Sequence, residues 1–219
     1  MKKVKTIILV LSYHDNGGIY DRFQKSQSET WDSIYHPETE TFFFYGNSIE
    51  NKIVDNKIYV KVEEDLWKCN LKTIESIKLI NSIFDYEYLF RTNSSSYIDK
   101  NTLNNFLSDK PIKNYYAGHS ARDQGVHYVS GSGIILSKDL VEIILENQNT
   151  IDLNLMDDAS FAKILNSRGI FPTQVDRCFY AHNVINQIDC KSFLYRLKSD
   201  NREIDIQNMY KIYDLKNKN

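Results

Sequence analysis

The sequence contains few of the residues that interrupt regular structure. It has only three prolines and eight glycines among 219 residues, with no internal repeat and no low-complexity linker. These features exclude a collagen-like chain, a repeat array and a largely disordered chain. With 42% hydrophobic and 13% aromatic residues, the chain can instead build one substantial core. We therefore expect a single domain over residues 1–219.

Cysteine is also scarce. The three cysteines, Cys69, Cys178 and Cys190, are an odd number, widely spaced and without a C-x-x-C pair. This pattern argues against a disulfide framework and against a zinc ribbon. It favours a reducing compartment, and we expect a cytoplasmic protein.

The sequence has neither a strong net charge nor a long apolar run. The formal net charge is −2 and the pI is about 6.2, so the basic footprint of a nucleic-acid partner is missing. The apolar run at residues 6–11 is short and lacks the cleavage pattern of a signal peptide. No window approaches the roughly 20 apolar residues that span a bilayer. We expect a soluble protein or a catalytic domain without its anchor, and the pattern leaves the oligomeric state open.

The fingerprints of common nucleotide-binding enzymes are missing as well. Neither G-x-x-x-x-G-K-[ST] nor G-x-G-x-x-G occurs in the chain. The segment Ser130-Gly131-Ser132-Gly133 is too short for a dinucleotide fingerprint, and apolar residues rather than a helix start follow it. These absences weaken the hypothesis of a P-loop or Rossmann dinucleotide enzyme.

What is present is an alternation of strand and helix signals. Apolar or alternating runs predict strands, and apolar residues three or four apart predict helices. The predicted strands lie at residues 6–11, 39–45, 57–62, 86–92 and 128–137. The predicted helices lie at residues 20–31, 71–84, 100–106, 138–145, 157–169 and from about 203 onward. This order predicts a three-layer α/β sandwich.

Several blocks carry a more specific signal because they follow one another in a fixed order. They are residues 8–13, 27–31, 65–73, 86–99 and 128–133, followed by the acidic pair Asp157-Asp158. In this order they resemble the nucleotide-sugar-dependent glycosyltransferases of the GT-A type, especially the fringe-like and β1,3-galactosyltransferase-like branch. The resemblance implies a GT-A, Rossmann-like, three-layer α/β/α sandwich with a mixed central sheet.

The resemblance assigns a donor site to the ends of two predicted strands. In this family a strand ends in an acidic triplet that holds a divalent metal, and here the triplet is Asn93-Ser94-Ser95. Amide and hydroxyl groups are poor ligands for Mn²⁺ or Mg²⁺, which are therefore possible but uncertain cofactors. Asn93 and Ser95 would contact the donor directly, or they form an Asx- or Ser-type turn. Tyr13 would meet a uracil-like base, or it is a core tyrosine.

Basic residues near this triplet are candidates for the donor diphosphate. Arg91 would make a bidentate contact with it, or it pairs with a carboxylate such as Asp65 or Asp99. Arg196, Lys198 and Arg202 form a local cluster that would replace missing metal charge, or they belong to a solvated tail. His182 stands where some relatives have a metal-binding histidine, although a lone histidine is more often structural.

The remaining candidates belong to the acceptor side. The glycines of Ser130-Gly131-Ser132-Gly133 would let backbone approach a sugar, or they form a bulged edge strand. By alignment with the family's acidic pair, Asp158 is the predicted general base and Asp157 the second choice. The alternative is that these aspartates cap a helix.

Together these assignments imply a glycosyltransferase. It would transfer a sugar from a nucleotide-diphosphate donor, with a UDP-sugar favoured, to a hydroxyl of a glycan or small acceptor. Inversion at the sugar is expected, and a retaining reaction stays open. The alternative from another class is a non-catalytic sugar-nucleotide or glycan-binding domain that kept the fold.

Overall fold

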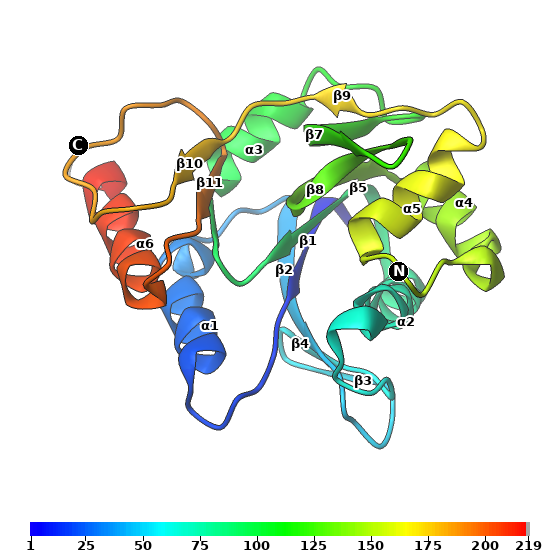
Figure 1. Cartoon of the computed structure of the whole chain (residues 1–219), viewed down its shortest axis with the longest axis horizontal. Helices are drawn as coiled ribbons and strands as arrows, with labels where there is room; N and C mark the ends of the chain where they lie inside the picture. The colour runs from blue at the N-terminus through cyan, green and yellow to red at the C-terminus, as the bar shows by residue number, and fades with distance from the viewer. Residues whose placement is uncertain (218–219) are drawn as a thin grey trace.

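A computed structural model describes residues 1–217 as three layers, with helices on both faces of a central mixed sheet (Figure 1). The sheet has eight strands in the order β3-β4-β2-β1-β5-β8-β7-β9. Its strands are β1 (Lys2–Leu11), β2 (Thr39–Tyr45), β3 (Lys52–Val54), β4 (Lys57–Tyr59), β5 (Phe84–Asn93), β7 (Tyr116–Asp123), β8 (Val126–Ser137) and β9 (Thr173–Gln174). The predicted three-layer α/β fold is thereby confirmed.

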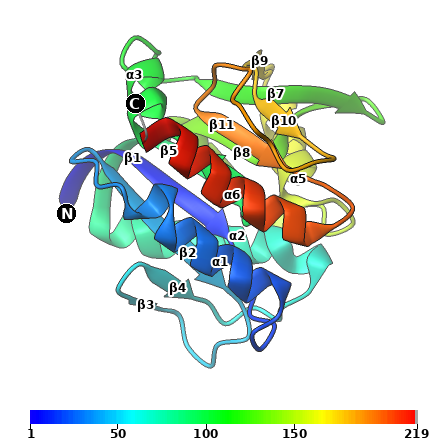
Figure 2. The same cartoon turned by 90° about the vertical axis from the view of Figure 1, so that its left-hand side faces the viewer.

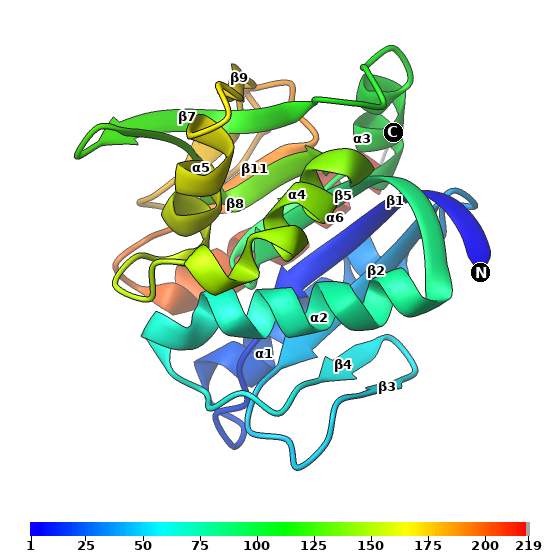
Figure 3. The ribbon, with the colours of Figure 1, turned by 90° about the vertical axis from the view of Figure 1, so that its right-hand side faces the viewer.

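Two hydrophobic cores hold the helices to the two faces. One face carries α1 (Ile19–Glu29), α3 (Lys100–Leu107) and α6 (Arg202–Asn217), and Figure 2 looks onto α1 and α6. The other face carries α2 (Cys69–Ile83), α4 (Lys138–Glu146) and α5 (Asp157–Asn166), as Figure 3 shows. Short 3₁₀ turns lie at η1 (Trp31–Ser33), η2 (Leu66–Lys68) and η3 (Gln148–Thr150).

The central strands are apolar because the sheet is covered on both faces. Ile7, Ile8, Leu9 and Val10 of β1 are all fully buried, and they divide alternately between the two cores. A run without polar alternation is typical of such a doubly covered parallel strand. In α2 the stripe Ile74, Ile77 and Ile80 faces the sheet, which is the spacing that predicted this helix.

The strand order creates a switch point beside β1. Strand β1 pairs in parallel with β2 on one side and with β5 on the other. The connection from β1 to β2 uses α1 on one face, whereas α2 leads into β5 on the opposite face. In open α/β sheets, ligands bind outside the carboxyl ends of the strands at such a point. Leu11 and Asn93, the last residues of β1 and β5, lie side by side there.

A second, small sheet lies at this end of the molecule. It consists of β10 (Cys178–Tyr180), β11 (Leu194–Leu197) and β6 (Ser96–Ile98), in that order. The strand β11 runs antiparallel to β6, so that Arg196 pairs with Ser96 directly after the Asn93-Ser94-Ser95 triplet. The small sheet therefore connects the carboxy-terminal part of the chain to the switch point.

Two predictions about individual residues were wrong. Cys178 and Cys190 form a disulfide, because the chain after β10 turns back and brings their Cα atoms within 5.9 Å. This pairing removes the cysteine argument for a reducing compartment. The predicted strand at residues 57–62 ends at Tyr59, because Tyr59 pairs with the last residue of β2, Tyr45, and with the first residue of β3, Lys52. Within residues 1–217, no helix is long and apolar enough to cross a membrane.

Candidate active site

A cleft of about 560 Å³ opens at the switch point. Residues from the ends of β1 and β5, the start of α2, and β11 line it. They are Leu11, Ser12, Tyr13, Tyr20, Glu64, Asp65, Leu66, Cys69, Lys72, Asn93, Ser94, Ser95, Arg196 and Arg202. Four of the predicted donor-binding residues, Tyr13, Asn93, Ser95 and Arg196, are therefore brought together from three distant parts of the sequence.

Two tyrosines form an accessible aromatic wall of this cleft. Tyr13 follows β1 and is 41% exposed, so it is not a core residue. Its ring meets the ring of Tyr20 edge to face, with centroids 5.4 Å apart. Edge-to-face pairing holds an aromatic ring in place without burying its other face. Tyr13 can therefore offer a flat surface to a planar ligand.

The Asn93-Ser94-Ser95 triplet forms the opposite wall. The Asn93 side chain accepts a hydrogen bond from the Ser96 hydroxyl at 3.1 Å and donates one to the Gly131 carbonyl at 3.4 Å. The guanidinium group of Arg196 donates to both Asn93 Oδ1 and Ser95 Oγ. The chain turns at Ser94 and Ser95, and all three residues of the triplet line the cleft. Asn93 Oδ1 accepts from side chains, so the Asx-type turn considered as an alternative stays a prediction.

Arg196 is a largely buried cation whose hydrogen-bond partners are both neutral. Among residues 1–217 it forms no ion pair, and its side chain donates only to Asn93 and Ser95. Arg202 is paired with the buried carboxylate of Asp205. Burial, followed by the charges of Arg202 and Arg177, lowers the pKa of Arg196 to about 10. A guanidinium in this setting is stabilised by an incoming anion.

The Asn93-Ser94-Ser95 triplet does not offer the ligand set of a divalent cation. The oxygen atoms of Asn93 and Ser95 already accept hydrogen bonds from a guanidinium, and neither is a carboxylate. No group of three His, Cys, Asp or Glu residues in the described chain is arranged to hold a metal ion. Hard cations take oxygen ligands that include carboxylates, so Mn²⁺ or Mg²⁺ does not fit this triplet.

Arg91 has a different environment from Arg196. Its side chain is 4% exposed and forms an ion pair with Asp157, with Nη2 2.7 Å from Oδ2. It also donates to the Gly131 carbonyl. Arg91 does not line the cleft. The alternative of a salt bridge is therefore the one observed, with Asp157 as partner instead of Asp65 or Asp99.

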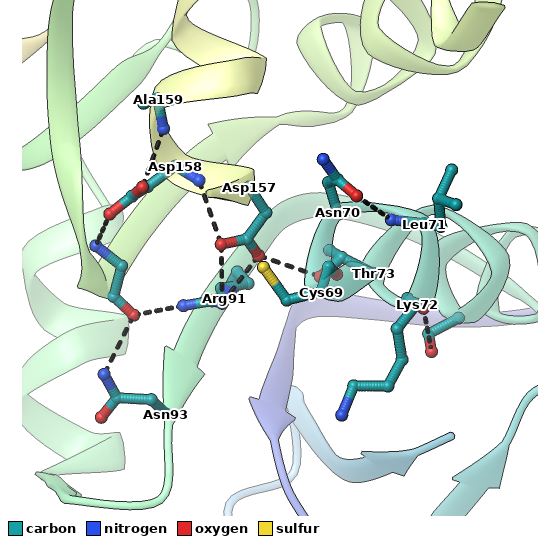
Figure 4. Close-up of polar contacts among 12 residues, drawn as sticks. Cys69, Asn70, Leu71, Lys72, Thr73, Arg91, Asn93, Asp157, Asp158 and Ala159 are labelled. Atoms are coloured by element: carbon teal, nitrogen blue, oxygen red, sulfur yellow. Dashed lines mark hydrogen bonds and ion pairs between the residues drawn. The ribbon is translucent and has the colours of Figure 1, made fainter. Parts of the chain in front are cut away.

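The adjacent aspartates at the start of α5 have different partners (Figure 4). Asp157 is 2% exposed and accepts hydrogen bonds from Arg91 and, at 2.9 Å, from the Thr73 hydroxyl. Asp158 forms no ion pair in residues 1–217 and accepts only the amides of Gly131 and Ala159, both at 2.8 Å. Burial, and then the charge of Asp157, raises the pKa of Asp158. Asp157 therefore holds Arg91, whereas Asp158 has no cationic partner in the described chain, and neither aspartate lines the cleft.

Met156, not an aspartate, is the N-cap residue of α5, and its side chain makes no capping hydrogen bond. Asp157 and Asp158 are the first two residues of the helix. The helix-cap alternative is therefore only partly right, because these carboxylates lie in the first turn. Negative charge there is favourable to the helix dipole.

Gly131 connects the two aspartates to the cleft. Its amide donates to Asp158, and its carbonyl accepts from Arg91 and Asn93. A Cβ atom at this position would lie 2.7 Å from Arg91 Nη1 and 3.2 Å from Asp158 Oδ2. Only glycine allows this close approach. The predicted acceptor segment therefore adjoins the predicted base, and the hydroxyls of Ser130 and Ser132 accept hydrogen bonds from Arg177.

Lys72 and Arg177 belong to this region although the sequence did not single them out as site residues. Lys72 lies on the buried side of α2, donates to the Ser12 carbonyl at 2.9 Å and pairs with Glu64. Burial lowers the pKa of Lys72. The sequence feature that could have identified Lys72 is its place among the regularly spaced apolar residues of α2. Arg177 had no such signal, because its partners lie 45 and 47 positions away.

Three further side chains lack either the position or the charge state needed for a role in the cleft. The Lys198 side chain is absent from the cleft lining, and its backbone amide donates to Tyr180. His182 is exposed in the loop after β10 and lines a separate pocket formed by residues 179–187 and Asp189. Cys69 lines the cleft, but burial raises the pKa of its thiol to about 11, so the thiol is protonated near neutral pH.

Comparison with known proteins identifies the architecture. No protein-family model matches the sequence, and no curated protein matches it significantly. A solved glycosyltransferase involved in glycosylation of the major capsid of PBCV-1 superposes with a TM-score of 0.56 at 15% identity, over 94% of this chain and 99% of that one. The galactosyltransferase LgtC, solved with donor and acceptor sugar analogues, gives 0.50 at 12% identity, over 96% and 94%. The fold is thus that of GT-A glycosyltransferases.

Proposed function

We propose that this protein is a glycosyltransferase that moves a sugar from a nucleotide diphosphate to an acceptor hydroxyl. The observation that carries the proposal is Arg196, a cation that lines the switch-point cleft and forms no ion pair in the described chain. In this fold the cleft is the place for a charged ligand. An unmatched guanidinium there calls for an anion such as a diphosphate.

The donor would lie across the cleft between Tyr13 and Arg196. The base of the nucleotide would stack on the accessible face of Tyr13, for which a uracil-like ring and hence a UDP-sugar is our preferred assignment. Arg196 would donate to the diphosphate oxygens, and Asn93 and Ser95 would hold the guanidinium in place or contact the donor. Arg91 would act indirectly, because its own charge is matched by Asp157.

Asp158 would be the general base. Its carboxylate would take the proton from the acceptor hydroxyl as that oxygen bonds to the anomeric carbon. The bond from the anomeric carbon to the diphosphate oxygen would break, and the nucleoside diphosphate would leave with the electron pair. Attack from the face opposite the leaving group inverts the anomeric centre. Arg196 would stabilise the charge that develops on the leaving diphosphate.

The environment of Asp158 suits this role. Because burial and Asp157 raise its pKa, its carboxylate binds a proton more readily than an ordinary aspartate. When it is ionised, a base with a higher pKa accepts a proton more effectively. The carboxylate of Asp157 is instead held in an ion pair with Arg91.

The replaced triplet favours a second candidate function, a domain that binds nucleotide sugars or glycans without turnover. Asn93 and Ser95 stand where the resembled family has acidic residues, and such a loss accompanies retained binding without chemistry when a fold is reused. This candidate predicts donor binding with no release of the nucleotide diphosphate.

One experiment separates the two functions. The purified protein would be incubated with UDP-, GDP- and TDP-linked sugars in the presence of a chelator, and nucleotide diphosphate release followed by chromatography. We expect slow release with a UDP-sugar, and loss of it in Asp158→Asn with UDP binding retained. Binding without release in the wild type, with and without added glycan acceptors, would favour the binding domain. No binding of any nucleotide would contradict both.

A further inference from the structure

The outer face of the small sheet carries a second cation with no ion-pair partner. In β10, Cys178 points into the core, whereas Phe179 points outward and is 52% exposed. The register pairs Phe179 with Arg196 on β11, so these two side chains share the outer face. Arg177 directly precedes β10, so by alternation it lies on the same side. Its guanidinium carbon lies over one face of the Phe179 ring, 5.6 Å from the ring centroid.

The charge of Arg177 is not balanced by a carboxylate. Within residues 1–217 its side chain donates only to hydroxyls, that of Ser130 at 2.9 Å and that of Ser132. The neighbouring Asp176 accepts instead from Gln174 at 3.2 Å and forms no ion pair in this part of the chain. Burial lowers the pKa of Arg177, which is the direction expected for a desolvated and unpaired cation. The two serine hydroxyls use only some of the N–H donors of the Arg177 guanidinium, so the others are available to a ligand.

Arg177 is not needed by the donor proposal. Arg196 lines the switch-point cleft, and Arg177 does not. The partners of Arg177 lie on β8 instead, and they flank Gly131, whose amide holds Asp158. Arg177 therefore belongs with the segment that the sequence assigned to the acceptor. The face of Phe179 that Arg177 does not cover adds a flat apolar surface on which the C–H face of a sugar ring can pack.

We propose that Arg177 and Phe179 bind an anionic sugar of the acceptor, with the guanidinium on its carboxylate or phosphate and the phenyl ring on its pyranose face. The acceptor role rests on the proposed function, whereas the binding of an anionic sugar does not. The bidentate geometry of arginine suits either anionic group. The test uses separate probes for the carboxylate and for the phosphate.

The test measures binding, so it does not depend on turnover. Methyl β-glucuronide, methyl β-glucoside, glucose 6-phosphate and glucose are titrated into the wild type and followed by protein NMR. We expect an anionic sugar to bind about tenfold tighter than its neutral counterpart, which is the weight of one or two charged hydrogen bonds. A preference confined to glucuronide assigns a carboxylate, and one confined to glucose 6-phosphate assigns a phosphate.

Two variants and a control locate the site. Arg177→Gln keeps a donor for Ser130 and should abolish the preference for anionic over neutral sugars. Phe179→Ala should weaken the binding of charged and neutral sugars alike. Arg168→Gln removes an exposed arginine from the far end of α5 and should change neither. Equal binding of charged and neutral sugars by the wild type would overturn the proposal. So would an unchanged preference in Arg177→Gln.

A UDP titration distinguishes failure of this inference from failure of the proposed function. If Arg177→Gln loses UDP affinity but shows no loss of sugar preference, Arg177 belongs to the donor site and the inference is wrong. If the anionic preference is present but no nucleotide binds, the inference stands and the glycosyltransferase proposal fails.

Discussion

Arg91 and Arg196 are both largely buried arginines near the Asn93-Ser94-Ser95 triplet, and their surroundings differ in one respect. Arg91 faces the carboxylate of Asp157. Arg196 faces an amide oxygen and a hydroxyl, with the positive charges of Arg202 and Arg177 nearby. A buried charge is tolerated when it is paired. The pair at Arg91 is therefore part of the framework, whereas the charge at Arg196 is available to a ligand.

The two aspartates of α5 repeat this difference with the opposite sign. Asp157 completes the Arg91 pair, and Asp158, next to it, has only backbone amides as partners. The comparison therefore assigns the matched pair Arg91–Asp157 to stability. The unmatched charges, Arg196 and Asp158, are those to which we propose donor binding and proton transfer.

The largest expected effect comes from breaking the matched pair. Asp157→Asn removes the counter-charge of a buried arginine, and such a change costs about 3–5 kcal/mol of unfolding free energy. Urea denaturation followed by circular dichroism would measure it. The control is Asp152→Asn, which breaks an exposed pair with Lys163 and should have little effect. Equal stability of the two variants would mean that Asp157 is not part of the framework.

Replacing the unmatched carboxylate of Asp158 should lower activity much more than stability. Asp158→Asn is expected to lower the rate of sugar transfer by about 10²–10⁴-fold, the usual contribution of a general base. Its unfolding free energy should fall by only about 1 kcal/mol, because no cation loses its partner and the Asn oxygen still accepts from one of the two amides. A large loss of stability with retained transfer would exchange the roles assigned to the two aspartates.

The raised pKa of Asp158 predicts how activity and stability each depend on pH. The base works only when ionised, so activity should rise with pH through a pKa above the ordinary value of 3.8. The effect on stability has the opposite sign. Because the folded pKa exceeds the unfolded one, the contribution of Asp158 is most favourable at low pH and is lost as pH rises from 3.8 through the folded pKa. Denaturation of the wild type and Asp158→Asn across this range would reveal the difference.

The smallest effect is expected at His182. Its side chain is exposed and makes no hydrogen bond within the described chain, and it lines a different pocket from the cleft. His182→Ala should change unfolding free energy by less than about 0.5 kcal/mol and leave UDP affinity unaltered with or without Mn²⁺. A loss of affinity seen only with Mn²⁺ would show that the cleft uses a metal after all.

The sequence was sufficient for features that depend on local patterns. The apolar run of β1 and the spacing of Ile74, Ile77 and Ile80 predicted elements that the structure confirms. Contacts between distant residues left no such pattern. Arg91 and Asp157 are 66 positions apart, and Arg196 and Asn93 are 103 apart. The sequence therefore could not decide whether an arginine faces a carboxylate or a ligand, nor could it predict the Cys178–Cys190 disulfide.

The most direct test asks whether Arg196 supplies the cation that meets the donor diphosphate. UDP would be titrated calorimetrically into the wild type, Arg196→Gln and the control Arg168→Gln, each with a chelator and again with Mn²⁺. We predict that the wild type and the control bind UDP equally well in both conditions. Arg196→Gln should bind roughly ten- to a hundredfold more weakly, as expected for the loss of charged hydrogen bonds. Binding of the wild type only with Mn²⁺, or unchanged affinity in Arg196→Gln, would contradict the account.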